Sequence, residues 1–81
     1  MTNELPEVEA VLDAPGTACA YLTPLIKEHL TPLASGEVLE VLSDDPAARE
    51  GVPAWSRLTG NDLVASVMDG ERNTRFFLRK K

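Results

Sequence analysis

The sequence predicts an α+β protein, a two-layer α/β sandwich in which a four-stranded mixed sheet carries two helices on one face. The chain has 81 residues, of which 43% are hydrophobic and 26% charged, as is typical of one globular domain with one core. Apolar residues alternate in four segments and recur at helical spacing in two segments between them. The order of these segments, β-α-β-α-β-β, places both helices on the same side of the sheet.

Charge and composition limit the classes of partner. The net charge of −5 argues against direct binding of nucleic acid, because phosphate binding requires clustered Lys and Arg. No apolar run approaches the roughly 20 residues that span a bilayer, and the first residues lack the features of a signal peptide. The single cysteine cannot form an internal disulfide, which fits a reducing cytoplasm. We expect one monomeric domain over residues 1–81 with no membrane partner and no cofactor, in which residues 1–6 are disordered.

The first predicted strand covers residues 8–13, where apolar and acidic residues alternate. Its apolar side consists of Val8, Ala10 and Leu12. Pro15 cannot donate to a strand ladder and Gly16 accepts a positive φ, so these two residues end the strand in a turn. The turn leads directly to Cys19, the only cysteine.

A helix is predicted after this turn from apolar residues at helical spacing, namely Leu22, Ile26, Leu30 and Leu33. Its start depends on Pro24, because an interior proline costs about 3 kcal/mol. In one reading the helix begins just after Cys19, and Pro24 lies at the edge of the first turn. In the other reading Thr23 is the N-cap and Pro24 is the first helical residue. The choice decides whether Cys19 lies at a helix end.

Residues 37–43 carry enough aliphatic side chains for a strand in the interior of the sheet. The acidic pair Asp44-Asp45 follows this strand and precedes Pro46. Asp45 can cap a helix whose first residue is Pro46, so we interpret the pair as a helix start rather than as a metal site.

The second helix contains a breaker. We expect Gly51-Val52-Pro53 to split it into a short turn and a second piece. The second piece contains Trp55, which we place in the core, and Leu58. It ends at Thr59-Gly60, a C-cap signal.

Two further strands are predicted over residues 62–68 and 73–79. Asp69-Gly70 is a strong hairpin signal, and the extra residues Glu71 and Arg72 allow a longer loop. One side of the last strand consists of Thr74, Phe76 and Leu78, and the other side consists of Arg75, Phe77 and Arg79. We therefore expect only one face of the sheet to be fully apolar.

These elements carry a set of short motifs whose spacing resembles a known family. The motifs are Leu12-Asp13-x-x-Gly16-x-x-Cys19, Gly36-Glu37, Asp44-Asp45-Pro46-Ala47, Val52-Pro53-x-Trp55, Gly60 and Phe77-x-Arg79-Lys80. Together they resemble the TusA/SirA-type sulfur carriers over nearly the whole chain. The resemblance implies a two-layer sandwich like the C-terminal domain of translation initiation factor three.

The resemblance also implies an activity. In this family the cysteine opens a Cys-Pro-x-Pro motif and accepts sulfane sulfur as a persulfide from a cysteine desulfurase, a rhodanese or another carrier. It then passes the sulfur to an acceptor protein for tRNA thiolation, cofactor sulfuration or sulfur metabolism. Here Ala20 and Leu22 stand at the two proline positions, and Ser56 and Asn61 stand where some members carry a cysteine and a histidine. The implied site is Cys19, with Asp13 and Gly16 shaping its loop.

The residues around Cys19 suggest two roles for it independently of the family resemblance. A thiolate at a helix N-terminus is stabilised by unpaired amide protons and by the positive end of the helix dipole. The alternative is a small buried hydrophobic residue. His29 lies ten residues away, about 15 Å along a continuous helix, so we expect no Cys-His pair. One Cys and one His cannot supply a zinc site, and no glycine-rich phosphate loop is present.

The basic end of the chain supplies candidate docking residues. Residues 1–50 hold ten acids and two bases, whereas residues 51–81 hold three acids and six bases. We predict that Arg75, Arg79 and Lys80 help to dock an acidic partner surface, with an ordinary solvated strand face as the alternative. The leading hypothesis is thus a sulfur carrier acting through Cys19, and the second is a non-catalytic interaction or regulatory domain of the same fold.

Overall fold

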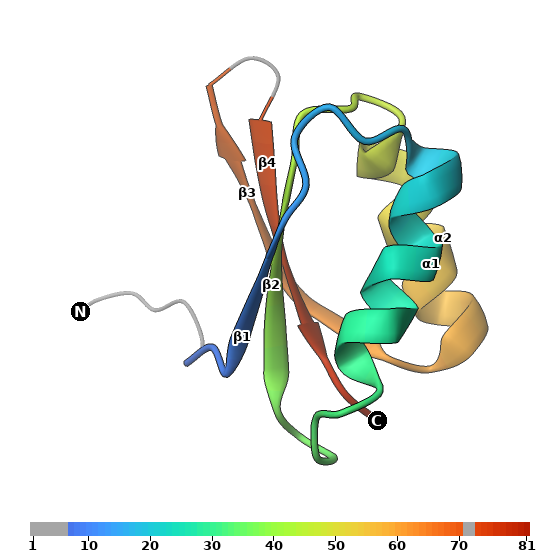
Figure 1. Ribbon diagram of the computed structural model, residues 1–81, viewed down its shortest axis with the longest axis vertical. Coiled ribbons are helices and arrows are strands. Elements are labelled where there is room, and N and C mark those ends of the chain that lie inside the picture. Colours follow the sequence, from blue (N-terminus) through green and yellow to red (C-terminus); the bar gives the residue numbers. More distant parts are fainter. Residues whose placement is uncertain (1–6, 71–72) are drawn as a thin grey trace.

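The computed structural model describes residues 7–70 and 73–81 and confirms the predicted α+β sandwich (Figure 1). The elements in chain order are β1 (Ala10–Asp13), α1 (Cys19–Leu30), β2 (Val38–Ser43), α2 (Ala48–Thr59), β3 (Asp62–Asp69) and β4 (Asn73–Arg79). The expectation of disorder for residues 1–6 and the loop residues Glu71 and Arg72 lie outside the described residues. Neither 12-residue helix, and no other helix in the described part of the chain, is long and apolar enough to cross a membrane.

The four strands form one mixed sheet in the order β1-β2-β4-β3. β1 runs parallel to β2, and both other pairs are antiparallel. β2 therefore lies inside the sheet, as its aliphatic sequence predicts. In its register Val41 faces Phe76, which brings two buried side chains together at the centre of the sheet.

Both helices cover the same face of the sheet and start at the same end of the molecule (Figure 1). This follows from the topology, since each helix returns along the sheet after one of the two parallel strands. The core between the layers contains Leu12, Leu22, Ile26, Leu30, Leu39, Val41, Val52, Phe76 and Leu78. One end of the sandwich thus collects the carboxyl ends of β1 and β2 and the first residues of both helices.

The first helix begins at Cys19, so the reading with an N-cap at Thr23 is wrong. Pro24 is the sixth residue of α1 and cannot donate a hydrogen bond to the carbonyl of Ala20. The helix tolerates this loss because Leu22 and Ile26, on either side of the proline, are fully buried. Packing, rather than local propensity, fixes the start of α1.

The second helix is continuous, so the predicted split at residues 51–53 is wrong. Ala48, Val52 and Ser56 are buried at spacings of four residues and hold one face of α2 on the sheet. Pro53 removes one amide from this helix without breaking it. The helix ends at Gly60, which adopts the left-handed conformation expected of a C-cap (φ +81°). Trp55 is half-buried and packs against the core, as predicted.

The sheet face opposite the helices carries both polar and apolar side chains, and it buries one aromatic residue. Phe77 is 1% exposed on this face, and the guanidinium of Arg75 lies 5.4 Å from its ring centroid. Arg75 Nε also donates to Glu40 Oε2 at 2.6 Å. The expectation that only one face is fully apolar is therefore confirmed, with an ion pair partly covering the aromatic residue on the other.

Candidate functional site

The loop that joins β1 to α1, residues 14–18, positions the predicted functional cysteine. It continues the sheet for one residue, since the amide of Ala14 donates to the carbonyl of Leu42 at 3.0 Å. Ala14 is buried in the core, and Asp13 before it is exposed at the end of β1. The amide of Thr17 donates back to the carbonyl of Ala14 at 3.3 Å and closes a turn. The loop thus starts from a fixed point at the edge of the core.

Gly16 has a backbone conformation that explains its presence in the motif. Its φ is +82°, in the left-handed region, and a Cβ added there would meet no atom within 4 Å. A larger residue would therefore be disfavoured by backbone strain and not by lack of space. The amide of Gly16 donates to Asp44 Oδ1 at 2.8 Å, which connects this loop to the loop between β2 and α2.

Cys19 is the first residue of α1, and Ala18 before it is the N-cap with extended backbone (φ −67°, ψ 151°). The carbonyl of Ala18 accepts hydrogen bonds from the amides of Tyr21, at 2.9 Å, and Leu22, at 3.0 Å. No side chain caps this end of the helix, and its first turn contains no acidic residue. The backbone of Cys19 therefore lies at the positive end of the helix dipole, with no carboxylate from the same turn to offset that end.

The first turn of α1 forms although both motif prolines are replaced. Leu22 uses the amide that a proline would lack, in its bond to the carbonyl of Ala18. Its side chain is fully buried in the core. Leu22 thus anchors the start of the helix by packing and by a hydrogen bond.

The second loop of the site follows β2. Asp45 Oδ1 accepts from the amide of Ala47 at 3.0 Å, and the amide of Asp45 donates to Ser43 Oγ at 3.2 Å. Asp45 thus closes the turn that leads into α2, but the helix begins only at Ala48, with Ala47 as its N-cap and no side-chain cap, so the predicted start at Pro46 with Asp45 as N-cap is wrong. The two loops line a shallow cleft of about 290 Å³, formed by Gly16, Thr17, Ala18, Asp44, Asp45 and Pro46.

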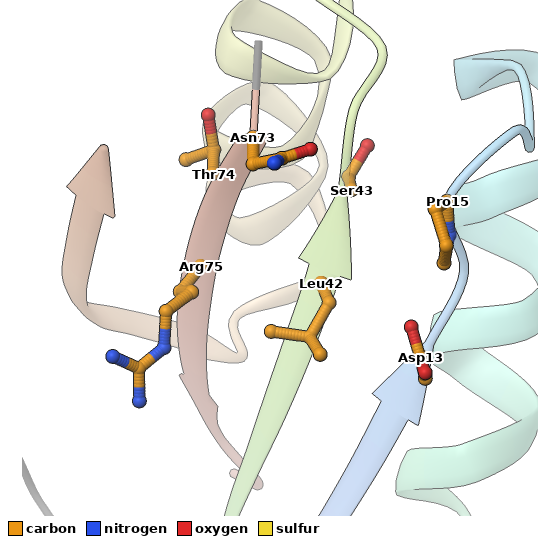
Figure 2. A pocket seen from close by; sticks show the side chains of 7 residues that line it. All are labelled: Asp13, Pro15, Leu42, Ser43, Asn73, Thr74 and Arg75. Carbon is orange, nitrogen blue, oxygen red and sulfur yellow. The ribbon is translucent and has the colours of Figure 1, made fainter. Parts of the chain in front are cut away.

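A second hollow of about 230 Å³ lies at the same end of the sheet, and Figure 2 shows its side chains. It is lined by Asp13, Pro15, Leu42, Ser43, Asn73, Thr74 and Arg75. In Figure 2 the side chain of Leu42 lies between Asp13 and Arg75, and the guanidinium of Arg75 points away from Asp13. The two charges do not converge, so this hollow offers no acid-base pair.

The predicted docking residues do not lie on one surface. Arg75 is on the open face of the sheet in its ion pair with Glu40. Arg79 is exposed at the end of β4. Lys80 lies at the other end of α1, where its Nζ donates to the carbonyls of Leu30 (3.0 Å), Leu33 (3.2 Å) and Thr31 (3.3 Å). This helix-closing contact of Lys80 was not predicted from the sequence.

The remaining candidate positions lie away from the loop of Cys19. His29 is half-buried near the far end of α1, and its Nδ1 donates to the carbonyl of Leu25 at 2.9 Å. Ser56 donates to the carbonyl of Asn61 and accepts the amide of Leu63 at 3.0 Å, so it joins α2 to β3. Within residues 7–70 and 73–81 no group of three or more His, Cys, Asp or Glu could hold a metal ion.

Sequence reasoning missed the role of Asp44. The sequence identifies the acidic pair as a helix start, and Asp45 does close the turn that precedes α2. Asp44 instead crosses to Gly16, which is 28 residues away in the chain. No spacing rule predicts such a contact, because it depends on the parallel pairing of β1 with β2.

Comparison with known proteins gives a consistent result. The family model described as "Sulfurtransferase TusA" matches residues 10–80. The putative sulfur carrier protein YrkI of Bacillus subtilis (strain 168) is 35% identical over 72 residues, which cover 89% of this chain and 95% of that protein. The sulfur carrier protein TusA of Pseudomonas putida (strain GB-1) is 32% identical over 81 residues, covering 100% of this chain and 98% of that protein. The putative sulfur carrier protein YrkF of Bacillus subtilis is 37% identical over 70 residues, which cover 86% of this chain and 37% of that protein.

Proposed function

This chain belongs to the sulfurtransferase TusA family, and on that premise we propose that it accepts sulfane sulfur as a persulfide on Cys19 and relays it to a partner protein. The observation that carries the proposal is the position of Cys19 as the first residue of α1. It is the only cysteine in the chain, so a persulfide on a cysteine of this protein can form only there.

The proposed transfer is a thiol exchange without net oxidation or reduction. The thiolate of Cys19 attacks the terminal sulfur of a donor persulfide, R–S–SH. The bond between the two donor sulfurs breaks, R–S⁻ leaves as a thiolate, and Cys19 becomes Cys–S–SH. In the second step a thiolate of the acceptor attacks the same terminal sulfur, and Cys19 returns to the thiolate form.

Both steps benefit from a stabilised anion at residue 19. The terminal turn of a helix presents amide protons and a positive dipole end, which favour a thiolate over a thiol. The same environment favours an ionised persulfide. The first turn of α1 contains no carboxylate that would oppose this effect.

The proposal assigns two kinds of protein partner. The donor is a cysteine desulfurase, a rhodanese or another carrier, and the acceptor takes the sulfur onward. We place the reaction in the cytoplasm, where a reducing environment keeps a lone thiol free for exchange. Arg75, Arg79 and Lys80 are proposed to contribute positive charge to partner encounter, from more than one face of the molecule.

The test is persulfide formation on the intact protein. The wild type and a Cys19→Ala variant are incubated with a cysteine desulfurase and cysteine, and the intact mass of each is then measured by mass spectrometry. We expect the wild type to gain one sulfur atom that a thiol reductant removes, and the variant to gain none. If competent donors of several classes leave the wild type unchanged, the non-catalytic interaction domain becomes the better description.

A further inference from the structure

We propose that Asp44 is a positioning residue for Cys19, acting through the hydrogen bond that its carboxylate accepts from the amide of Gly16. The proposal rests on the proposed function, since it concerns the loop that directly precedes Cys19. The contact is short, at 2.8 Å between Gly16 N and Asp44 Oδ1. A side-chain oxygen thus accepts a backbone amide of an exposed loop, 28 residues away in the chain.

This hydrogen bond, the Gly16–Asp44 tether, matters because few side chains in the loop of residues 14–18 are buried. Ala14 is 6% exposed and Leu22 is fully buried, so the chain is fixed at these two points. Between them Pro15, Gly16 and Ala18 are exposed, and Thr17 is only half-buried. The segment that leads into α1 therefore depends on hydrogen bonds, such as those from Gly16 N to Asp44 and from Thr17 N to Ala14.

The tether joins the two loops that lie at the same end of the sandwich. Gly16 lies two residues before the N-cap of α1, and Asp44 follows directly after β2. Because β1 and β2 are parallel neighbours, both loops leave the same edge of the sheet. The carboxylate of Asp44 thus fixes the start of α1 to the rigid centre of the sheet.

The neighbouring carboxylate has a different task. Asp45 Oδ1 accepts the amide of Ala47 in the turn that precedes α2. Asp44 makes its contact in the other loop. The adjacent carboxylates are therefore separable by mutation, and replacing Asp44 leaves the hydrogen bond from Ala47 to Asp45 in place.

The tether is expected to matter for sulfur transfer because the thiol must meet a donor sulfur in a defined geometry. Small misplacements of a reacting group slow such steps strongly. Without the bond to Asp44, residues 15–18 gain conformational freedom that must be lost again in each encounter. We expect the loss to slow persulfide formation on Cys19 about tenfold.

Three variants test the proposal. Asp44→Ala removes the acceptor, whereas Asp44→Asn removes the charge but keeps a side-chain oxygen that can accept the Gly16 amide. The matched control is Glu37→Ala, because Glu37 Oε1 accepts the amide of Ala34 at 2.7 Å in a loop at the other end of the molecule. For each protein we would measure the rate of persulfide formation with a desulfurase, and the pH dependence of alkylation of Cys19 by iodoacetamide.

We expect Asp44→Ala to be slowed in persulfide formation, with the apparent pKa of alkylation moved towards that of a free thiol because the helix start is less ordered. Loss of the carboxylate charge alone would instead lower this pKa, so a lowered pKa would overturn the positioning role. We expect Asp44→Asn and Glu37→Ala to stay within about twofold of the wild type. Equal loss in Asp44→Ala and Asp44→Asn would show that charge acts instead of the hydrogen bond, and wild-type behaviour of Asp44→Ala would also overturn the proposal. If the wild type takes up no sulfur, the proposed function fails, while the alkylation profiles still decide the role of Asp44.

A measurement on the wild type covers the case in which Asp44→Ala does not fold. The amide of Gly16 should exchange with deuterium more slowly than the amide of Ala18, an exposed residue of the same loop. Exchange of the Gly16 amide as fast as in an unfolded peptide would contradict a persistent bond to Asp44.

Discussion

At the scale of single residues, the site is built from backbone conformations more than from reactive side chains. Gly16 supplies a left-handed φ, Ala18 an extended N-cap and Cys19 the first helical position. No histidine or metal cluster within the described residues accompanies the thiol. The feature of the described residues that favours a thiolate at residue 19 is its place at the helix end.

The thiol itself gives the prediction at this scale. We expect the pKa of Cys19, taken from the pH dependence of its alkylation, to lie below the roughly 8.5 of a free thiol, because the helix end stabilises the thiolate. The same measurement in urea, with the chain unfolded, provides the reference. A pKa in the folded protein at or above the unfolded value would favour a structural cysteine.

At the scale of elements, the two helices show why sequence patterns predict that a helix exists better than they predict where it begins and ends. The period of Leu22, Ile26 and Leu30 identifies α1, but the proline at 24 leaves two possible starts. Burial of Leu22 decides between them, and burial is a property of the assembled layers. The split predicted in α2 fails for the same reason, because Val52 is packed on the sheet next to Pro53.

Proline is expected to lower the free energy of unfolding by different amounts at the two motif positions in α1, Ala20 and Leu22. Leu22→Pro removes a buried side chain and the bond from the Leu22 amide to the carbonyl of Ala18, so it should cost about 3 kcal/mol or more of folding free energy. Ala20→Pro places the proline in the first turn on an exposed residue and should cost less than about 1 kcal/mol. Urea unfolding of both variants tests this order, and equal costs would contradict the anchoring role of Leu22.

At the scale of the whole molecule, the parallel helices give the sandwich two distinct ends. The loops before α1 and α2 meet at one end, and the chain returns to the other end after β4 (Figure 1). There Lys80 Nζ closes the end of α1 by donating to the carbonyls of Leu30, of the C-cap Thr31 and of Leu33 beyond it. This positive charge lies where the helix dipole is negative, a favourable arrangement.

Loss of the hydrogen bonds of Lys80 is expected to lower the stability of the fold without affecting residues 14–18, the loop that precedes Cys19. Lys80→Met keeps an apolar stem but removes the ammonium group, and should lower the free energy of unfolding by about 1 to 2 kcal/mol. The apparent pKa of Cys19 in alkylation should stay unchanged, because Lys80 lies at the opposite end of α1. Arg79→Met, at an exposed neighbouring position, is the control for stability. A free energy of unfolding of Lys80→Met as high as that of Arg79→Met would contradict the closure by Lys80.

The sequence predicts the architecture of this protein well because each element carries its own local signal. The order of strands and helices, the central place of β2 and the C-cap at Gly60 all follow from short patterns. The tether from Gly16 to Asp44 and the closure by Lys80 join residues 28 and about 50 positions apart. Such contacts exist only once the sheet is assembled, so no local pattern predicts them.

The packing of Trp55 against the core has a practical consequence for spectroscopy. The chain contains one tryptophan and one cysteine, so its intrinsic fluorescence comes from a single indole on α2 and a thiol-specific dye reports from residue 19 alone. Energy transfer from this indole to the dye would follow the separation of α2 from the start of α1. A change in this energy transfer would report loosening of residues 14–18 or their contact with a partner. No residue has to be added to the protein for this measurement.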